Sequence, residues 1–415
     1  MRTQTRIWIG TGIAVVVGLA IAWSRPVNAA AATVIRVPQD QPTIQAGIDA
    51  ATTGDTVLVA AGTYVENIDY KGKEITVASA NGRNMTIIDG NHAGPVVRLN
   101  ASAGQKPILR GFTIRNGAND GGVLTSGGSP LIEKNKIMNN TTCGQGGGVN
   151  VSFSAAVIRN NMISNNRQQG CSGGPGGGGI FVGGAGTVQI LHNKIIGNTH
   201  GSFGGGISLF AAGTPTISGN RIQSNNGGTE GGGIALVNQS DATIVNNVIN
   251  GNTAGDGGGI YWLVPSGAVG PAVVNNTIAA NSAGRGTAVF ADGFDVQAKL
   301  VNNVLTGSGT AAVLYCGDFN DPNPPQISFN DVWNSTGGPR YGGICPDATG
   351  TNGNISADPL FAKKFHLQPT SPAIDVGTNA GAPPRDIDND PRPLDGNGDG
   401  SAITDMGADE VKPPA

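Results

Sequence analysis

Aromatic and charged residues are scarce in this sequence of 415 residues. Phe, Trp and Tyr make up 5% of it and Asp, Glu, Lys and Arg 13%, whereas glycine occurs 68 times. So few bulky side chains exclude a wide conventional hydrophobic core. The 25 Lys and Arg residues are unclustered along the sequence and the formal net charge is -3, which argues against nucleic acid as a partner.

Long apolar runs are missing everywhere except near the start. An apolar run from Ile7 to Trp23 follows Arg2 and Arg6 and precedes a small-residue site at residues 27–29. This order predicts a signal peptide over residues 1–29 and a secreted protein, extracellular or at the cell surface, with no transmembrane segment after cleavage. The run is slightly longer than most signal cores, so an uncleaved N-terminal anchor is the alternative.

Cysteine and histidine are rare, with four residues of each. Cys143 and Cys171, and likewise Cys316 and Cys345, are separated by 28 or 29 residues, which predicts two disulfides in an exported chain. A four-thiolate metal site would need close spacing such as CxxC, which is absent. The four histidines fit no common ligand spacing and receive no role.

Asparagine and glycine repeat along the middle of the sequence. The motif Asn-x-(Ile/Leu/Val) recurs every 26 to 32 residues, at Asn135, Asn161, Asn193, Asn220, Asn247, Asn276, Asn303 and Asn330. A second asparagine stands five residues after each of the first six, and a Gly-Gly-Gly-(Val/Ile) stretch opens five repeats. Self-similarity at a fixed period is typical of a solenoid.

Each repeat contains short alternations of apolar and polar residues, such as Thr216-Ile217-Ser218, that change phase at the asparagines. Period two predicts strands, and the phase breaks predict corners. Three strands and three corners fill about 27 residues, so the fold class is all-β, a right-handed parallel β-helix of about ten rungs. Asparagine tolerates a positive φ at a corner and can bond to its equivalent one rung away, and glycine permits close approach of rungs.

The ends of the solenoid carry their own patterns. Ile44 and Ile48 lie on one face of a short amphipathic helix that begins near Thr43, and this helix is predicted to cap the open end of the coil. We assign the β-helix with its cap to residues 33–365 and an Asp- and Gly-rich closing segment to residues 366–415.

A resemblance to a known superfamily agrees with this fold. The stretches Thr43-Ile44-Gln45, Gly62-Thr63-Tyr64 and Ile87-Ile88-Asp89-Gly90 resemble the opening of the pectin lyase-like superfamily, and the Asn-x-Ile rungs look like its repeats. The resemblance covers nearly the whole mature chain and implies the fold. It does not imply one activity, because this scaffold hosts lyases, hydrolases, epimerases, adhesins and tailspikes.

Signature motifs of pectin methylesterases, polygalacturonases and alginate epimerases are absent. The Gly-Gly-Gly-Ile and Ile-x-x-Asn pairs also resemble repeats of polymorphic outer-membrane adhesins. The segment from Ser371 to Glu410 looks like the closing segment of many secreted bacterial β-helix proteins.

The resemblance implies that the strand after each glycine triplet lines a ligand groove. Glu230, Asp256 and Arg285 precede the glycines of successive repeats, so we expect them to form a column of candidate catalytic residues. Two carboxylates about 5 Å apart raise the pKa of one unless Ca²⁺ or Arg285 lies between them. A cation beside an acidic sugar supports β-elimination, and an acid next to a nucleophile suits a retaining glycosidase. A solvated ion-pair ladder is the alternative.

Some of the strands that follow the glycines carry an aromatic residue at their second position. If the isoleucines point inward, Phe181, Tyr261 and Phe290 lie on the outer side, where their rings can stack on sugars as candidate substrate-binding residues. Isolated exposed aromatic residues also occur without any ligand.

One metal motif lies near the C-terminus. Asp395, Asn397 and Asp399 alternate with glycines as in a Ca²⁺ loop, and Asp405 is a candidate substitute because position twelve is Met406 rather than Glu. The prediction is a structural Ca²⁺ site, and the alternative is an Asp- and Gly-rich turn.

Two functions remain open from the sequence. In the first, a secreted monomer binds an extracellular polysaccharide in the first-strand groove, with lyase-type cleavage as an additional step. In the second, the chain is a non-catalytic adhesin or structural solenoid. The sequence leaves open whether the protein is an enzyme.

Overall fold

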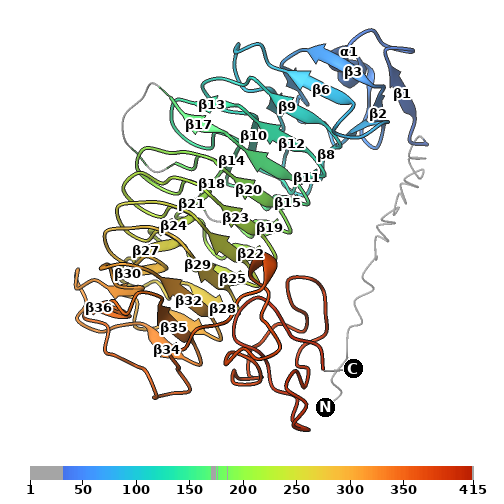
Figure 1. The fold of residues 1–415 in the computed structure, drawn as a ribbon. Coiled ribbons are helices and arrows are strands. Elements are labelled where there is room, and N and C mark those ends of the chain that lie inside the picture. The colour runs from blue at the N-terminus through green and yellow to red at the C-terminus, as the bar shows by residue number, and fades with distance from the viewer. Residues whose placement is uncertain (1–30, 170–173, 175, 185, 414–415) are drawn as a thin grey trace, which may run out of the picture. The chain divides into compact units, whose positions relative to one another are not determined.

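Three parallel sheets run side by side from residue 34 to residue 343, as Figure 1 shows. The structure is a computed structural model that describes residues 31–169, 174, 176–184 and 186–413. The predicted signal peptide at residues 1–29 lies outside the described residues. Within the described ranges, no helix has the length and apolarity needed to span a membrane.

Each rung contributes one strand to each sheet. Sheet A consists of β1 (Val34–Val37), β2 (Thr56–Val59), β5 (Thr76–Ser79), β8 (Ile108–Arg110), β11 (Leu131–Glu133), β15 (Val157–Arg159), β19 (Gln189–Leu191), β22 (Thr216–Ser218), β25 (Thr243–Val245), β28 (Ala272–Val274), β31 (Lys299–Val301) and β34 (Gln326–Ser328). Sheet B consists of β3 (Gly62–Val65), β6 (Thr86–Asp89), β9 (Thr113–Arg115), β12 (Lys136–Met138), β16 (Met162–Ser164), β20 (Lys194–Ile196), β23 (Arg221–Gln223), β26 (Val248–Asn250), β29 (Thr277–Ala279), β32 (Val304–Gly307) and β35 (Asp331–Asn334).

Sheet C, which contains the strands after the glycine triplets, consists of β4 (Ile68–Asp69), β7 (Val97–Arg98), β10 (Val123–Ser126), β14 (Val149–Ser152), β18 (Ile180–Gly183), β21 (Ile207–Phe210), β24 (Ile234–Val237), β27 (Ile260–Val264), β30 (Val289–Gly293), β33 (Leu314–Cys316) and β36 (Tyr341–Gly343). A fourth, two-stranded sheet pairs β13 (Thr141–Thr142) with β17 (Arg167–Gln168).

Equivalent residues of successive rungs lie in register. Ile190 pairs with Ile217, and Ile217 pairs with Ile244, all three with no exposed surface. The inward side chains of the three sheets therefore form one narrow core of stacked aliphatic residues. The predicted parallel β-helix is confirmed, and its small core explains why so few aromatic residues are needed.

Both asparagine columns are buried hydrogen-bonded ladders, as predicted. Asn220 donates from its backbone N and from Nδ2 to Oδ1 of Asn247, at 2.9 and 3.0 Å, and Nδ2 of Asn247 donates to Oδ1 of Asn276 at 2.9 Å. The backbone differs from the expectation in one detail. The left-handed conformation belongs to the residue before the ladder asparagine, such as Asn246 with φ 54° and Asn275 with φ 51°.

The N-terminal helix α1 (Ile44–Ala50) begins where predicted. The Thr43 hydroxyl accepts a hydrogen bond from the Ala46 backbone N at 3.1 Å, which caps the helix. Ile44 and Ile48 are fully buried against the first rungs. A Cβ on Gly47 would lie 2.8 Å from a Val57 methyl group, so the helix sits tightly on the end of the coil.

The closing segment, which we define as residues 366–413, packs against the corner between sheets A and B of the last rungs. The 3₁₀ helix η1 (Lys363–Phe365) directly precedes it in the chain. Nδ2 of Asn275 donates to the Asp405 carbonyl at 3.0 Å, and Nδ2 of Asn302 donates to the Thr378 carbonyl at 2.8 Å. Side chains of this corner therefore hold the segment in place.

A disulfide joins Cys316 of β33 to Cys345, which confirms one of the two predicted bridges. The other predicted bridge involves Cys171, which lies outside the described residues.

Candidate functional site

The glycine triplets make sharp entries into sheet C. Gly231 has φ 64°, and a Cβ there would lie 2.4 Å from the Ile234 carbonyl oxygen. Gly232 has no room either, because its Cβ would lie 2.5 Å from the Gly258 carbonyl of the next rung. Only glycine permits this turn and this stacking, as the sequence predicted. The residue before each triplet is thereby placed at the edge of the outer face of sheet C.

The predicted charged column exists. Glu230 bridges to Asp256 and Asp256 to Arg285 in parallel register. Nε and Nη2 of Arg285 donate to the two carboxylate oxygens of Asp256, at 2.8 and 2.6 Å. This pairing raises the pKa of Arg285 further above its usual range. Arg285 is half exposed, so the ion pair contributes at most about 1 kcal/mol to stability.

Glu230 has no cationic partner in this column. Burial raises the pKa of its carboxyl group to about 7, the Tyr261 side chain acts in the opposite direction, and the charge of Asp256 raises it again. A carboxyl group that titrates near neutral pH can donate and accept a proton under ordinary conditions. Glu230 is therefore the member of the column that suits acid–base chemistry.

The aromatic residues share one column but are not an exposed platform. Phe181, Tyr261 and Phe290 occupy equivalent positions on the outer side of sheet C, and their exposed fractions are only 1%, 6% and 3%. The glycine turns cause this burial, because a Cβ on Gly257 would lie 2.8 Å from Cβ of Tyr261. Their predicted role as exposed sugar-stacking residues is corrected accordingly. Phe181 is also separated from Tyr261 by two rungs that carry Ser208 and Ala235.

A stack of three rings covers the C-terminal rungs of this face. Tyr261, Phe290 and Tyr315 lie with ring centroids 5.3 and 5.2 Å apart, and the Arg285 guanidinium lies 4.8 Å from the Phe290 centroid. The outer-face cluster consists of Phe203, Phe210, Ala235, Val237, Tyr261, Leu263, Phe290 and Tyr315. Its half-buried members, Phe203, Phe210, Leu263 and Tyr315, present the apolar surface that the fully buried rings do not.

Two members of this site were missed by sequence reasoning. Tyr315 follows no glycine triplet, so its strand was not recognised, although it stands 25 residues after Phe290. Asp292 lies two residues beyond Phe290 and thus on the same side of β30. Its Oδ1 accepts hydrogen bonds from the backbone N atoms of Gly293 and Phe319, and burial raises its pKa.

Comparison with known proteins agrees with this architecture. The family model of the right-handed β-helix region matches residues 55–201, 171–305 and 203–332. The chain belongs to the right-handed β-helix family. Pectate lyase Pel9A has a similar structure, with a TM-score of 0.52 and 16% identity over 88% of this chain and 90% of that chain, which is a likeness of fold.

A second solved structure, the PL6 family alginate lyase AlyGC, aligns with a TM-score of 0.32 and 13% identity over 69% of this chain. The chain spans 53% of that lyase, and the likeness is too low to carry an argument. A comparison with curated protein sequences finds no match.

The charged column of this β-helix protein does not fit a resident Ca²⁺ ion. Arg285 occupies both carboxylate oxygens of Asp256, and two backbone N–H groups occupy Oδ1 of Asp292. In the part of the chain that the structure describes, three acidic or histidine ligands gather only at His366, Asp388 and Asp409. The column therefore holds an ion pair in place of a set of metal ligands.

In the predicted Ca²⁺ loop, side-chain oxygens accept hydrogen bonds from backbone N–H groups of the same loop. Oδ1 of Asp395 accepts hydrogen bonds from the backbone N atoms of Gly398 and Asp399, and Oδ1 of Asn397 also accepts from the backbone N of Asp399. The oxygens of Asp395, Asp399 and Asp405 do not gather around one centre. This geometry matches the Asp- and Gly-rich turn, and the Ca²⁺ site stays a prediction.

Asp405, the fourth predicted ligand, belongs to a different environment. It is fully buried, and its two oxygens accept hydrogen bonds from the backbone N atoms of Asp375 and Val411. Burial, with a further contribution from the charge of Glu410, raises its pKa to about 8. Asp405 thus organises the closing segment instead of completing the loop.

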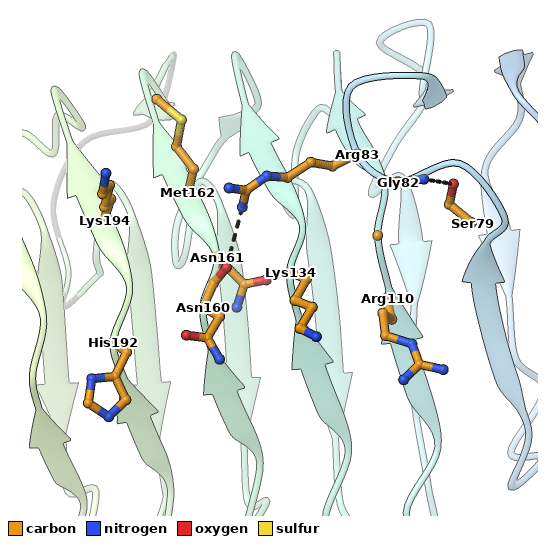
Figure 2. Close-up of a pocket in the computed structure, with 11 residues that line it drawn as sticks. Ser79, Gly82, Arg83, Arg110, Lys134, Asn160, Asn161, Met162, His192 and Lys194 are labelled. Atoms are coloured by element: carbon orange, nitrogen blue, oxygen red, sulfur yellow. Dashed lines mark hydrogen bonds between the residues drawn. The ribbon is translucent and has the colours of Figure 1, made fainter. Parts of the chain in front are cut away.

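A basic groove of about 820 Å³ lies over the corner between sheets A and B (Figure 2). Its lining includes Arg83, Arg110, Lys134, His192 and Lys194 but neither Asp nor Glu. This corrects the expectation of unclustered cations. The residues are distant in sequence, and the solenoid brings them together because equivalent corners of successive rungs stack.

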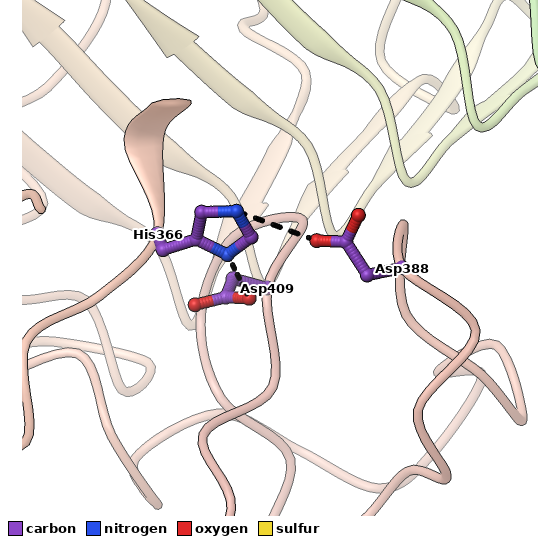
Figure 3. Close-up of side chains that lie close together, drawn as sticks. All are labelled: His366, Asp388 and Asp409. Atoms are coloured by element: carbon purple, nitrogen blue, oxygen red, sulfur yellow. Dashed lines mark hydrogen bonds and ion pairs between the residues drawn. The ribbon is translucent and has the colours of Figure 1, made fainter. Parts of the chain in front are cut away.

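His366, Asp388 and Asp409 meet in the closing segment (Figure 3). Nδ1 of His366 lies 2.9 Å from Oδ1 of Asp409, and Nε2 lies 3.5 Å from Oδ2 of Asp388. The two carboxylates contact opposite ring nitrogens, and Asp409 also accepts a hydrogen bond from the Leu367 backbone N at 2.8 Å. This arrangement ties the two ends of the segment together.

Proposed function

We propose that this protein is exported and binds an extracellular polysaccharide across the outer face of sheet C. The observation that carries the proposal is the combination, on one face, of half-buried aromatic and aliphatic side chains with Glu230, Asp256 and Arg285. Apolar ring faces beside charged hydrogen-bonding groups are what sugar rings require from a protein surface. The likeness of fold to a protein named as a pectate lyase supports a polysaccharide as the ligand.

Cleavage by elimination is the reaction that this geometry would serve best. In such a step Glu230 takes the proton next to a uronate carboxylate, the bond to the leaving sugar oxygen breaks to give an unsaturated product, and that oxygen leaves as a hydroxyl group after taking a proton from water. Arg285 exchanges Asp256 for the substrate carboxylate and stabilises the charge that develops on it. Because Glu230 must be ionised, the rate should rise with pH through about 7.

The test uses pectate, alginate and a neutral glucan, immobilised for binding and free in solution for cleavage, with and without added Ca²⁺. Glu230→Gln should abolish the ultraviolet-absorbing product and keep binding, whereas Arg285→Gln should weaken binding to the two acidic glycans. Arg115→Gln is the matched control, because Arg115 forms a similar ion pair with Asp89 on sheet B. No retention and no product on any glycan would refute the proposal.

A non-catalytic adhesive or structural solenoid is the second candidate. The mutual neutralisation of Asp256 and Arg285 and the burial of Tyr261 and Phe290 favour it. It predicts that Glu230→Gln and Asp256→Asn change neither glycan retention nor product formation.

Export has a separate test. N-terminal sequencing of protein recovered from the culture medium should begin at residue 30 if residues 1–29 are removed. Retention of the whole protein in the membrane fraction would favour the uncleaved anchor.

A further inference from the structure

The basic groove at the corner between sheets A and B holds three cations, Arg83, Lys134 and Lys194, that no carboxylate among the described residues pairs with. Glu133 pairs with Arg110 at 3.5 Å and with Arg159 at 2.8 Å, which leaves it no capacity for the lysines. Lys134 and Lys194 are exposed, and within the described ranges neither forms an ion pair. In a chain of net charge -3, this local excess calls for an anionic partner.

The groove is elongated along the solenoid. Figure 2 shows Arg110, Lys134, Asn160 and His192 in a row, each from the next rung, and rungs stack about 4.8 Å apart. Arg83 reaches over this row from the loop between β5 and β6 and donates to the Asn135 and Asn160 carbonyls at 3.2 and 3.3 Å. A row of polar and cationic side chains along four rungs, with the Arg83 guanidinium above it, fits an extended polyanion better than a single compact ion.

Two side chains of the row occupy a costly backbone conformation. Lys134 has φ 56° and His192 has φ 52°, at a corner position where most other rungs have glycine or asparagine, as at Gly111, Asn160 and Gly219. The left-handed conformation costs such side chains free energy, because Cβ approaches the following carbonyl oxygen. The cation at position 134 is thus present in spite of the local backbone preference.

We propose that this groove binds a linear anionic polysaccharide, with its carboxylate or sulfate groups at Arg83, Lys134 and Lys194. The proposal concerns a second site and does not rest on the function proposed for sheet C. The carboxylate groups of a glycan can bind through the cations alone, whereas single-stranded nucleic acid also relies on aromatic side chains for base stacking, and the lining contains no Phe, Tyr or Trp. The predicted export also places the groove among extracellular glycans.

The experiment measures binding of the full chain to polygalacturonate, with uncharged dextran as the comparison, in the wild-type and Arg285→Gln backgrounds. Lys134→Gln combined with Lys194→Gln should weaken polygalacturonate binding about five- to tenfold in both backgrounds, and added salt should weaken it further. Lys106→Gln combined with Lys299→Gln removes the same charge from exposed positions elsewhere and should leave binding unchanged. Thermal unfolding of each variant confirms that it folds.

Several outcomes would overturn the proposal. These are unchanged binding in the groove variant, an equal loss in the control variant, equal retention on dextran, and groove-dependent binding of a single-stranded oligonucleotide that is tighter than that of polygalacturonate. If the wild type and the control variant self-associate and the groove variant does not, the groove instead binds a second copy of the chain. A loss confined to the Arg285→Gln variant would instead implicate sheet C.

Discussion

In the rungs, the ladder asparagines bond to the equivalent asparagine of the next rung, whereas in the closing segment the buried charged groups have partners of different kinds. Asn247 is one of many identical members of a ladder. Arg392 and Glu410 form a single ion pair at 2.7 Å with neither side chain exposed. In the ladder the contribution to stability is divided among many similar hydrogen bonds, whereas the stability of the closing segment depends on one ion pair.

The largest effect should come from breaking that unique pair. Arg392→Met leaves the Glu410 carboxylate buried without its cation, and it also removes donors to Asn246 and to the Asp409 carbonyl. We expect a loss of about 3–5 kcal/mol in the stability of the closing segment. Amide hydrogen exchange should show faster exchange in residues 371–411 while the first rungs keep their protection.

The control is Arg340→Gln, which breaks the exposed ion pair with Asp347 and should cost less than about 1 kcal/mol. Equal exchange of the first rungs and the closing segment in the Arg392 variant would contradict the contrast between the two regions.

A ladder substitution should have a smaller effect. Asn247→Ala removes the acceptor of the Asn220 backbone N–H and side chain, and it leaves the Ile217 carbonyl without its donor. Buried unsatisfied groups of this kind cost about 1–3 kcal/mol, and denaturant unfolding measures the loss. Asn84→Ala, at an exposed position, should stay within about 0.5 kcal/mol of the wild type. Equal losses in the two variants would argue against the ladder as a source of stability.

Glu230 should make stability depend on pH. Its pKa rises from 4.5 to about 7 on folding, so the stability it contributes is present below about pH 4.5 and lost as the pH rises through 7. Glu230→Gln should remove this decrease in the free energy of unfolding. We expect the decrease to be about 1 kcal/mol, because solvent screens a half-buried group. Unfolding curves at pH 5 and pH 8 measure it, and parallel pH profiles for the two proteins would disprove the assignment.

The smallest effect concerns the exposed corner between sheets A and B. Lys134→Asn should stabilise the solenoid by up to about 1 kcal/mol, because asparagine tolerates φ 56° better than lysine. Asn160→Lys, one rung away, should destabilise it by a similar amount. Thermal unfolding compares the two, and shifts of the same sign would show that the backbone is not the cause.

Sequence reasoning predicted the features that depend on the position of a residue within the repeat. The asparagine ladders, the glycine turns, the helix cap, the Cys316–Cys345 bridge and the alignment of Glu230, Asp256 and Arg285 all follow from a position within the period. Sequence reasoning did not predict that Tyr261 and Phe290 are buried, because their burial depends on how closely the glycine turn packs against them.

By itself, the sequence determined the parallel β-helix and its columns of equivalent side chains. Every rung repeats the same pattern of strand-forming and corner-forming residues, and stacking of the rungs places equivalent positions above one another. Only the tertiary structure decided which charges have no ion-pair partner among the described residues, as at Lys134, and which are buried in an ion pair, as at Arg392. The reason is that solvent access and pairing depend on neighbours from distant rungs and from the non-repeating closing segment.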